Sequence, residues 1–238
     1  MGAPAPRFSP VDLNTGAAWI GSRMMGKPVE QGGIREHTEA LENFRKLAKT
    51  NPVEYRPNIA ATLNYLANLH QETGRHDEAE REYMEALEIY RELATTRPET
   101  YQPQVATTLN NLAVLHMNTG RHDEAEREYM EELEIRRELA KASPGAYRPA
   151  VADTLKNLAI LHAATGNHDA AEREFMEVLE IRRELATASP GAYRPGVAET
   201  LNNLAILHAA TGNHDAAERE YMEALEIRRE LATASPGA

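Results

Sequence analysis

Residues 193–238 read YRPGVAETLNNLAILHAATGNHDAAEREYMEALEIRRELATASPGA, and residues 147–192 carry the same 46-residue sequence at all but five positions. The unit also begins, with more changes, at residues 55 and 101. One such unit cannot bury its apolar side alone, so tandem copies stack into a solenoid with a continuous core. Because solenoids offer long surfaces rather than enclosed pockets, the repeat favours binding over catalysis. The five differences are Ala150/Gly196, Asp153/Glu199, Lys156/Asn202, Phe175/Tyr221 and Val178/Ala224.

Two antiparallel helices are expected in each unit. In the second copy, Pro103 suits the first turn of a helix because it lacks only an N–H that would be unpaired there. One face of an amphipathic helix is then predicted from residues that recur at three- and four-residue steps, namely Val105, Leu109, Leu112, Ala113, Leu115 and His116. Gly120 supplies a left-handed exit, and a second helix is expected from about Asp123.

The second helix has an apolar stripe and a charged surface. Its predicted buried stripe is Ala125, Tyr129, Leu133, Ile135 and Leu139. Its predicted charged faces are Glu128, Glu131, Glu132, Arg136 and Arg137, which can pair along the helix. Residues 143–145, Ser-Pro-Gly, are expected to end this helix, and residues 147–149, Tyr-Arg-Pro, to start the next unit.

The periodicity divides the chain into six segments. We predict a flexible N-terminal arm, a capping half-repeat helix and four repeats, at residues 1–35, 36–54, 55–100, 101–146, 147–192 and 193–238. The cap is a lone second helix, because Glu39–Ala48 matches Glu85–Ala94. No polar closing helix follows the last repeat, so Tyr221 and Leu225 are expected to be exposed. This end either docks on another protein or another copy, or exposes an area small enough to tolerate.

Composition excludes several classes of protein. The 238 residues carry a formal charge of -11 and no block of Lys or Arg, which disfavours nucleic-acid binding. The absence of cysteine excludes disulfides and thiolate chemistry, and it fits a cytoplasmic location. No apolar run approaches the length of a bilayer-spanning helix. Residues 1–27 contain Trp19 and Ile20 near Arg23, so this arm is either flexible or a weak interfacial membrane anchor.

Histidine and carboxylate residues recur but suggest no catalytic site. Two histidines stand six residues apart in every copy, and this spacing does not align two imidazoles on one helix face for a metal. They are His70/His76, His116/His122, His162/His168 and His208/His214. We predict that the first of each pair packs in the core and the second opens a helix. With no phosphate loop or nucleophile elbow, the sequence predicts a non-enzymatic protein without a catalytic residue, metal or cofactor.

The motifs resemble a known family. Residues 108–113, Thr-Leu-Asn-Asn-Leu-Ala, followed by His116, Gly120, Ala125 and Tyr129, resemble the tetratricopeptide repeat, particularly that of kinesin light chains. The resemblance implies an all-α, right-handed superhelical solenoid of antiparallel helix pairs, here with 46-residue repeats. Residues before Glu36 show no heptad pattern, so the chain is more similar to the small bacterial kinesin light chains that accompany bacterial tubulins. It implies an adaptor that binds tubulin-like filaments and links them to membrane or cargo.

The resemblance also implies that the first helices line an inner groove for a protein or extended peptide. Twelve residues are expected to line it, namely Asn64, Tyr65, Asn68, Asn110, Asn111, Val114, Lys156, Asn157, Ile160, Asn202, Asn203 and Ile206. An asparagine amide both donates and accepts, so Asn111, Asn157 and Asn203 can hold a peptide main chain. Alternatively, the asparagines bridge helices or are hydrated. Lys156 is the one clear cation of the set, which disfavours capture of a C-terminal carboxylate. The alternative function is a scaffold that self-assembles through its C-terminal end.

Overall fold

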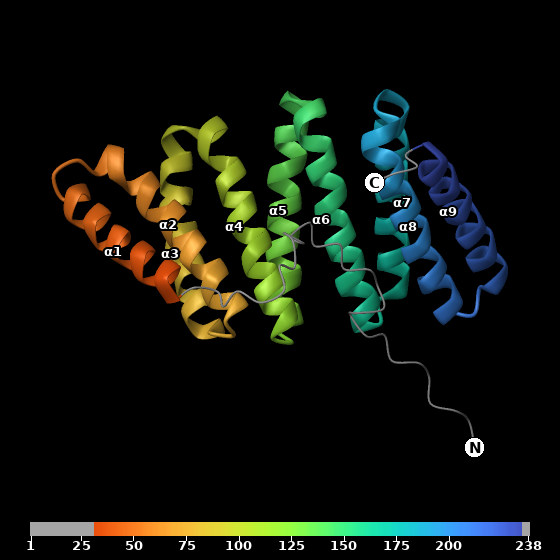
Figure 1. Cartoon of the computed structure of the whole chain (residues 1–238), viewed down its shortest axis with the longest axis horizontal. Coiled ribbons are helices and arrows are strands. Elements are labelled where there is room, and N and C mark those ends of the chain that lie inside the picture. Colours follow the sequence, from red (N-terminus) through yellow and green to blue (C-terminus); the bar gives the residue numbers. More distant parts are fainter. Residues whose placement is uncertain (1–30, 235–238) are drawn as a thin grey trace, which may run out of the picture. The chain divides into compact units, whose positions relative to one another are not determined.

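The computed structural model describes residues 31–234, which form nine α-helices and no strand (Figure 1). The chain divides into two compact units between Leu139 and Ala140. The N-terminal unit contains α1 (Gln31–Ala48), α2 (Pro52–Glu72), α3 (His76–Thr96), α4 (Pro98–Asn118) and most of α5 (His122–Ala142). The C-terminal unit contains α6 (Pro144–Thr165), α7 (His168–Ala188), α8 (Pro190–Ala210) and α9 (His214–Ala234). The expected interfacial anchor at Trp19 and the chain end at residues 235–238 lie outside the described residues.

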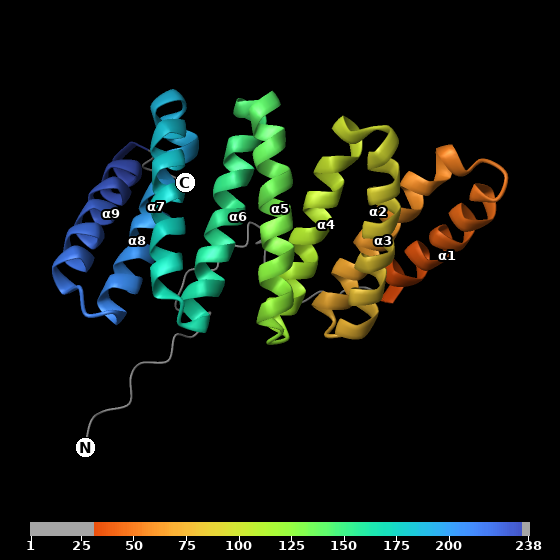
Figure 2. The same cartoon turned by 180° about the vertical axis from the view of Figure 1, so that it is seen from behind.

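Consecutive helices within each unit run antiparallel and side by side, as both views show (Figures 1 and 2). The first helices of the four repeats are α2, α4, α6 and α8, and the second helices are α3, α5, α7 and α9. Each first helix ends at a glycine with positive φ, such as Gly120 at 79°, which lets the chain reverse without a side-chain clash. The predicted all-α class of tandem helix pairs is confirmed. None of the described helices combines the length and apolar content that crossing a bilayer requires.

The first helices begin five residues earlier than predicted. α4 starts at Pro98 and α6 at Pro144, so Pro103 and Pro149 lie inside their helices. The sequence offered two prolines for the first turn, and the earlier one takes that position. Only one residue, Ser143, separates α5 from α6, and the backbone N–H of Tyr147 donates to its carbonyl at 3.2 Å. The predicted end of the helix at Ser143 is therefore confirmed, whereas the predicted start of the next helix at residues 147–149 is wrong.

The cap helix α1 also begins earlier than predicted. It starts at Gln31, so residues 31–35 are helical and are not part of a flexible arm. Leu41 of α1 is buried in the core of the N-terminal unit, together with Leu63, Tyr83 and Leu109 of the following helices. Burying side chains of this size stabilises each helix pair by several kcal/mol in total, at roughly 1.5–3 kcal/mol a side chain.

The apolar stripe of α5 is only partly as predicted. Ala125, Tyr129 and Leu133 are buried, whereas Ile135 and Leu139 are half-buried. Glu132 was expected on a charged face, but its side chain is fully buried, with 0% of its surface exposed. It occupies the small-residue position that its counterparts in the other repeats fill with Ala86, Val178 and Ala224, which faces the core. Its carboxylate lies 2.6 Å from Nε of Arg136, one turn along, so the buried charge is paired.

The C-terminal unit has its own core, in which Phe175 and Leu179 of α7 pack with Leu201 and Leu204 of α8. The last helix has no neighbour on the equivalent side within the described residues. Tyr221 is 41% exposed and Leu225 is 47% exposed, as the sequence predicted. Within residues 31–234, no helix therefore covers these two side chains of α9.

Candidate functional site

The N-terminal unit carries six of the twelve expected binding residues on α2 and α4. We call them the N-terminal first-helix face, and they are Asn64, Tyr65, Asn68, Asn110, Asn111 and Val114. Tyr65 is the most exposed of them, at 46%. Its ring stacks on the His37 ring of α1 with centroids 4.1 Å apart and planes at 27°. The other five are partly exposed. This face thus combines an aromatic platform with amide groups that a partner can reach.

Two asparagines of this face have structural partners. The Asn64 side-chain amide donates to the Thr108 hydroxyl at 2.8 Å, which ties α2 to α4. The Tyr83 hydroxyl donates to Asn68 and also to Gln71, at 3.1 Å for the latter. These contacts support helix bridging, the alternative role, for Asn64 and Asn68. Asn111 is half-buried and accepts a long 3.5 Å bond from Asn110, so its amide remains available to a ligand.

The C-terminal unit carries the other six expected residues on α6 and α8. Asn157, Asn202 and Ile206 are partly exposed, and we call these three the C-terminal first-helix face. The other three are enclosed, with exposed fractions of 4% for Lys156, 3% for Ile160 and 0% for Asn203. Neither amide atom of Asn203 has a hydrogen-bond partner within residues 31–234. The three partly exposed residues are therefore the ones that a partner reaches first.

A buried charge network, which we call the Arg182 network, explains why Lys156 is enclosed. The guanidinium of Arg182 extends from α7 and donates to the carbonyl of Gly196 at 2.9 Å and to the Thr200 hydroxyl at 3.0 Å. It also pairs with Glu199 of α8 at 3.0 Å and with Asp153 of α6 at 3.2 Å. Lys156 Nζ lies 3.6 Å from the other oxygen of Glu199. Two cations and two anions thus join three helices.

Sequence reasoning missed the Arg182 network, although a signal was present. Three of the five differences between the last two copies involve its residues, which are Gly196, Asp153, Glu199 and Lys156. A Cβ atom on Gly196 would lie 3.2 Å from the Arg182 side chain, so only glycine leaves full room for the guanidinium there. Differences among near-identical copies therefore marked an interface between helices.

The recurring core histidines bond to glutamates of the second helices. His70, His116, His162 and His208 are buried, and each Nδ1 lies 2.7–2.8 Å from a carboxylate of Glu82, Glu128, Glu174 and Glu220 respectively. Two of them also contact the preceding repeat, because Nε2 of His116 lies 3.3 Å from Glu80 and Nε2 of His208 lies 3.2 Å from Glu172. The packing role is confirmed. Within residues 31–234, no three His, Asp or Glu side chains form a metal-binding group.

The environment of His208 makes stability depend on pH. Burial lowers its pKa, but hydrogen bonds to Glu220 and Glu172 outweigh burial and raise the pKa above 6.5. Burial also raises the pKa of Glu220 above 4.5. The folded protein then holds these protons more tightly than the unfolded chain does. Their stabilising contribution is full below the unfolded pKa values and is lost as pH rises through the folded ones.

We therefore expect His208→Gln to remove part of this pH dependence. The unfolding free energy of the wild-type protein minus that of the variant should be larger at pH 6 than at pH 8. Urea unfolding followed by circular dichroism at both values measures it. The exposed His214 of the same repeat supplies the control, because His214→Gln should leave the difference nearly constant. An equal difference for His208→Gln at both values would contradict the pKa argument.

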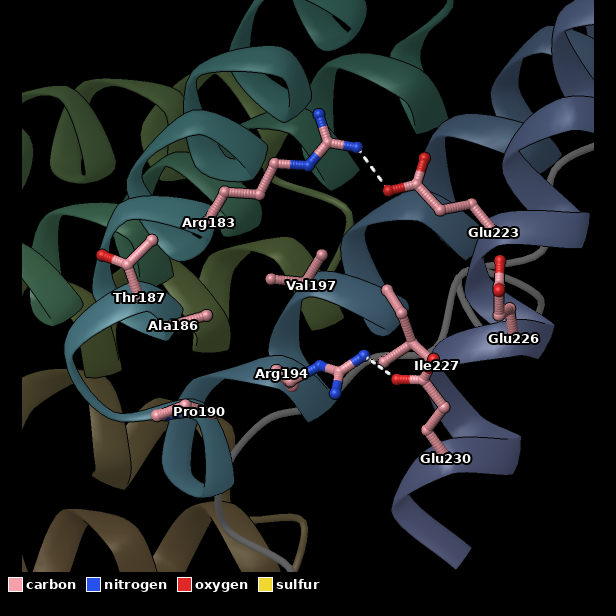
Figure 3. Close-up of a pocket in the computed structure, with 10 residues that line it drawn as sticks. All are labelled: Arg183, Ala186, Thr187, Pro190, Arg194, Val197, Glu223, Glu226, Ile227 and Glu230. Atoms are coloured by element: carbon pink, nitrogen blue, oxygen red, sulfur yellow. Dashed lines mark hydrogen bonds and ion pairs between the residues drawn. The ribbon is translucent and has the colours of Figure 1, made fainter.

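The C-terminal unit has a groove of about 560 Å³ between α7, α8 and α9 (Figure 3). Arg183 pairs with Glu223 at 2.5 Å and Arg194 pairs with Glu230, above an apolar floor that includes Ile227. The N-terminal unit has the same ion pairs at the same repeat positions, which are Arg45–Glu85, Arg91–Glu131 and Arg56–Glu92. Exposed pairs contribute roughly 0.2–1 kcal/mol each. The ion pairs that border the groove thus recur along the repeats.

Helix pairs of this length, each with a left-handed glycine exit from the first helix, define a helical-repeat protein. The tetratricopeptide repeat family matches residues 34–92, 104–184 and 183–230, and the chain belongs to this family. Its members typically serve as scaffolds for protein interaction and not as catalysts. No curated protein is significantly similar in sequence.

Solved structures show the same fold at low sequence identity. The BtubC (BKLC) protein from P. vanneervenii is 23% identical, with 87% of this chain and 93% of that chain covered and a TM-score of 0.52. A putative kinesin light chain with nearly identical repeats, from Podosopora anserina, is 18% identical, with 88% and 92% covered and a TM-score of 0.64. MamA is 15% identical, with 87% and 98% covered and a TM-score of 0.54. These likenesses establish the fold alone.

Proposed function

We propose that the protein is a non-enzymatic adaptor that binds a protein partner, through an extended segment, on its first-helix faces. The observation that carries this proposal is the partial exposure of asparagines on the first helices of each unit, at Asn111 in the N-terminal unit and at Asn157 and Asn202 in the C-terminal unit. Each of these amides can donate to and accept from a peptide main chain, which does not depend on the sequence of the peptide. Tyr65 adds an exposed ring at the start of the N-terminal face.

A peptide library displayed on phage tests this proposal. The wild-type protein should enrich binding peptides, and the triple variant Asn111→Ala, Asn157→Ala, Asn202→Ala should bind them at least tenfold more weakly, as expected when about 1.4 kcal/mol of hydrogen bonding is lost. The matched control is Met130→Ala, Met176→Ala, Met222→Ala, three exposed residues of the second helices. Equal binding by the triple variant and the wild type, with both folded, would move the site away from the first-helix faces.

The finer proposal is that the partner is a tubulin-like filament in the cytoplasm, which the protein links to membrane or cargo. The resemblance of the repeats to those of bacterial kinesin light chains supports it, as does the shared fold with BtubC. Sedimentation with polymerised bacterial tubulin tests it directly. Wild-type protein should pellet with the polymer, and the triple asparagine variant should stay in the supernatant. Wild-type protein that stays in the supernatant at saturating polymer would remove tubulin as the partner.

A second function is self-association through the C-terminal end. The exposure of Tyr221 and Leu225 on α9 favours it, because both side chains are of a size that the other repeats bury. This function uses a surface separate from the first-helix faces, so the two are compatible.

A further inference from the structure

The exposed face of α9 is the fourth copy of an interface that the chain already uses. Tyr221 corresponds to Tyr83 and Phe175, and Leu225 corresponds to Leu87 and Leu179. All four counterparts are buried. On α3 the covering element is α4, and on α7 it is α8, in each case the first helix of the next repeat. The chemistry that fits α9 is therefore that of a first helix of this same repeat.

Two charged residues beside this apolar patch also lack the partners that their counterparts have. Glu80 and Glu172, at the position of Glu218, contact a histidine of the following first helix. Arg91 and Arg183, at the position of Arg229, pair with a glutamate of the following second helix. Within residues 31–234, Glu218 and Arg229 have no such partner. We call Glu218, Tyr221, Leu225 and Arg229 the α9 face.

On the first repeat, the residues that face the preceding helix lack the acidic partner that their counterparts in later repeats have. His116 and Arg121 both contact Glu80 of the preceding second helix, the arginine at 2.5 Å. Their counterparts in the first repeat are His70 and Arg75, and the preceding helix α1 has Ile34 where a glutamate is needed. Nε2 of His70 accordingly has no hydrogen-bond partner within the described residues, and Arg75 donates a 3.4 Å hydrogen bond to Thr73 and interacts with Glu82 of its own repeat, but has no glutamate of α1 to pair with.

Helix α1 covers the first repeat at the positions where a second helix of a preceding repeat would lie. Leu41 is buried at the position of Leu225, and Arg45 pairs with Glu85 at 2.6 Å at the position of Arg229. At the position of Tyr221, however, α1 has His37, which stacks on Tyr65 of α2, and α1 has no acid for His70. The α9 face thus has the residue types of the repeat at all four positions, whereas α1 has them at two and fills the others with Ile34 and His37.

We propose that the α9 face of one copy docks on α2 and α3 of a second copy and displaces the second copy's α1. The proposal rests on the self-association function and identifies its receiving surface. Glu218 then meets His70 and Arg75, Arg229 meets Glu85, and Tyr221 and Leu225 pack on α2. The contact is heterologous, so successive copies join head to tail. Because α1 competes within its own chain at millimolar effective concentration, association requires concentrated protein.

Sedimentation velocity of the full chain from micromolar to millimolar concentration tests the docking. The wild-type mass should rise with concentration, and Leu225→Glu should remain a monomer. Met222→Glu is the matched control, because Met222 is exposed like its counterparts Met84 and Met176 on covered helices. Leu41→Glu should loosen α1 and increase association, and the Leu41→Glu, Leu225→Glu double variant should be monomeric.

A charge exchange tests the receiving surface separately. Glu218→Lys should weaken association roughly tenfold, and adding Arg75→Glu to the same chain should restore it. Both residues are exposed, so the variants are expected to fold. Wild type and folded Leu41→Glu that both stay monomeric would overturn the self-association function as well as the docking. Association that depends on Leu225 but is not restored by the charge exchange would overturn only the receiving surface.

Discussion

Phe175→Ala is expected to lower the unfolding free energy of the protein by about 3–5 kcal/mol, the loss usual for a fully buried aromatic side chain. None of the Phe175 surface is exposed, and its ring lies in the core where α7 meets α8. The deletion leaves a cavity that close-packed neighbours fill only in part. Urea unfolding followed by circular dichroism measures the loss.

The repeat supplies a control at the same position. Tyr221 is the counterpart of Phe175 on α9, and 41% of its side chain is exposed. Tyr221→Ala should cost only about 1 kcal/mol, because the ring buries less area and water replaces it without a cavity. Equal losses for the two variants would mean that α9 is covered in solution. If the two losses of unfolding free energy were equal at high protein concentration but differed after dilution, the result would agree with docking of a second copy on α9.

The fold was predictable because the period and the apolar pattern agree in every copy. Leu109, Leu112 and Tyr129 are buried as expected, and Gly120 has the expected left-handed conformation. The residue at which each first helix begins was not predictable, because two prolines five residues apart are each suited to a first turn. The structure decides between the two prolines through a backbone hydrogen bond. The carbonyl of the residue before the earlier proline, such as Ser143, accepts this bond from the first turn of the helix.

The candidate site was predictable only as a set of positions. The resemblance indicated which turns of the first helices lack a covering second helix, and nine of the twelve expected residues are partly or fully exposed. Lys156, Ile160 and Asn203 are enclosed, because exposure depends on how the neighbouring helix and its long side chains pack. Pattern alone also could not show that Glu132 is buried with Arg136, since a paired charge and a solvated charge look alike in sequence.

Arg182→Ala is the second large effect, with an expected loss of about 3 kcal/mol, the lower end of the range for breaking a buried ion pair. The substitution removes four contacts of the guanidinium and leaves Glu199 partly compensated by Lys156. Asp153 is 59% exposed and is rehydrated, which keeps the loss from being larger. The control is Arg228→Ala, the same repeat position on α9, where the side chain is exposed and the change should stay within about 0.5 kcal/mol.

A substitution at Gly196 tests the Arg182 network independently. Whether Gly196→Ala raises or lowers the unfolding free energy should depend on the presence of the Arg182 side chain. In a helix, alanine is normally about 1 kcal/mol better than glycine. Gly191→Ala, with no atom within 4 Å of the new Cβ, should show this gain. Gly196→Ala should instead destabilise the protein, since its Cβ forces the guanidinium away from Glu199 and Thr200. In the Arg182→Ala background the same substitution should stabilise it. A Gly196→Ala effect of one sign in both backgrounds would contradict the proposed fit between the glycine and the arginine.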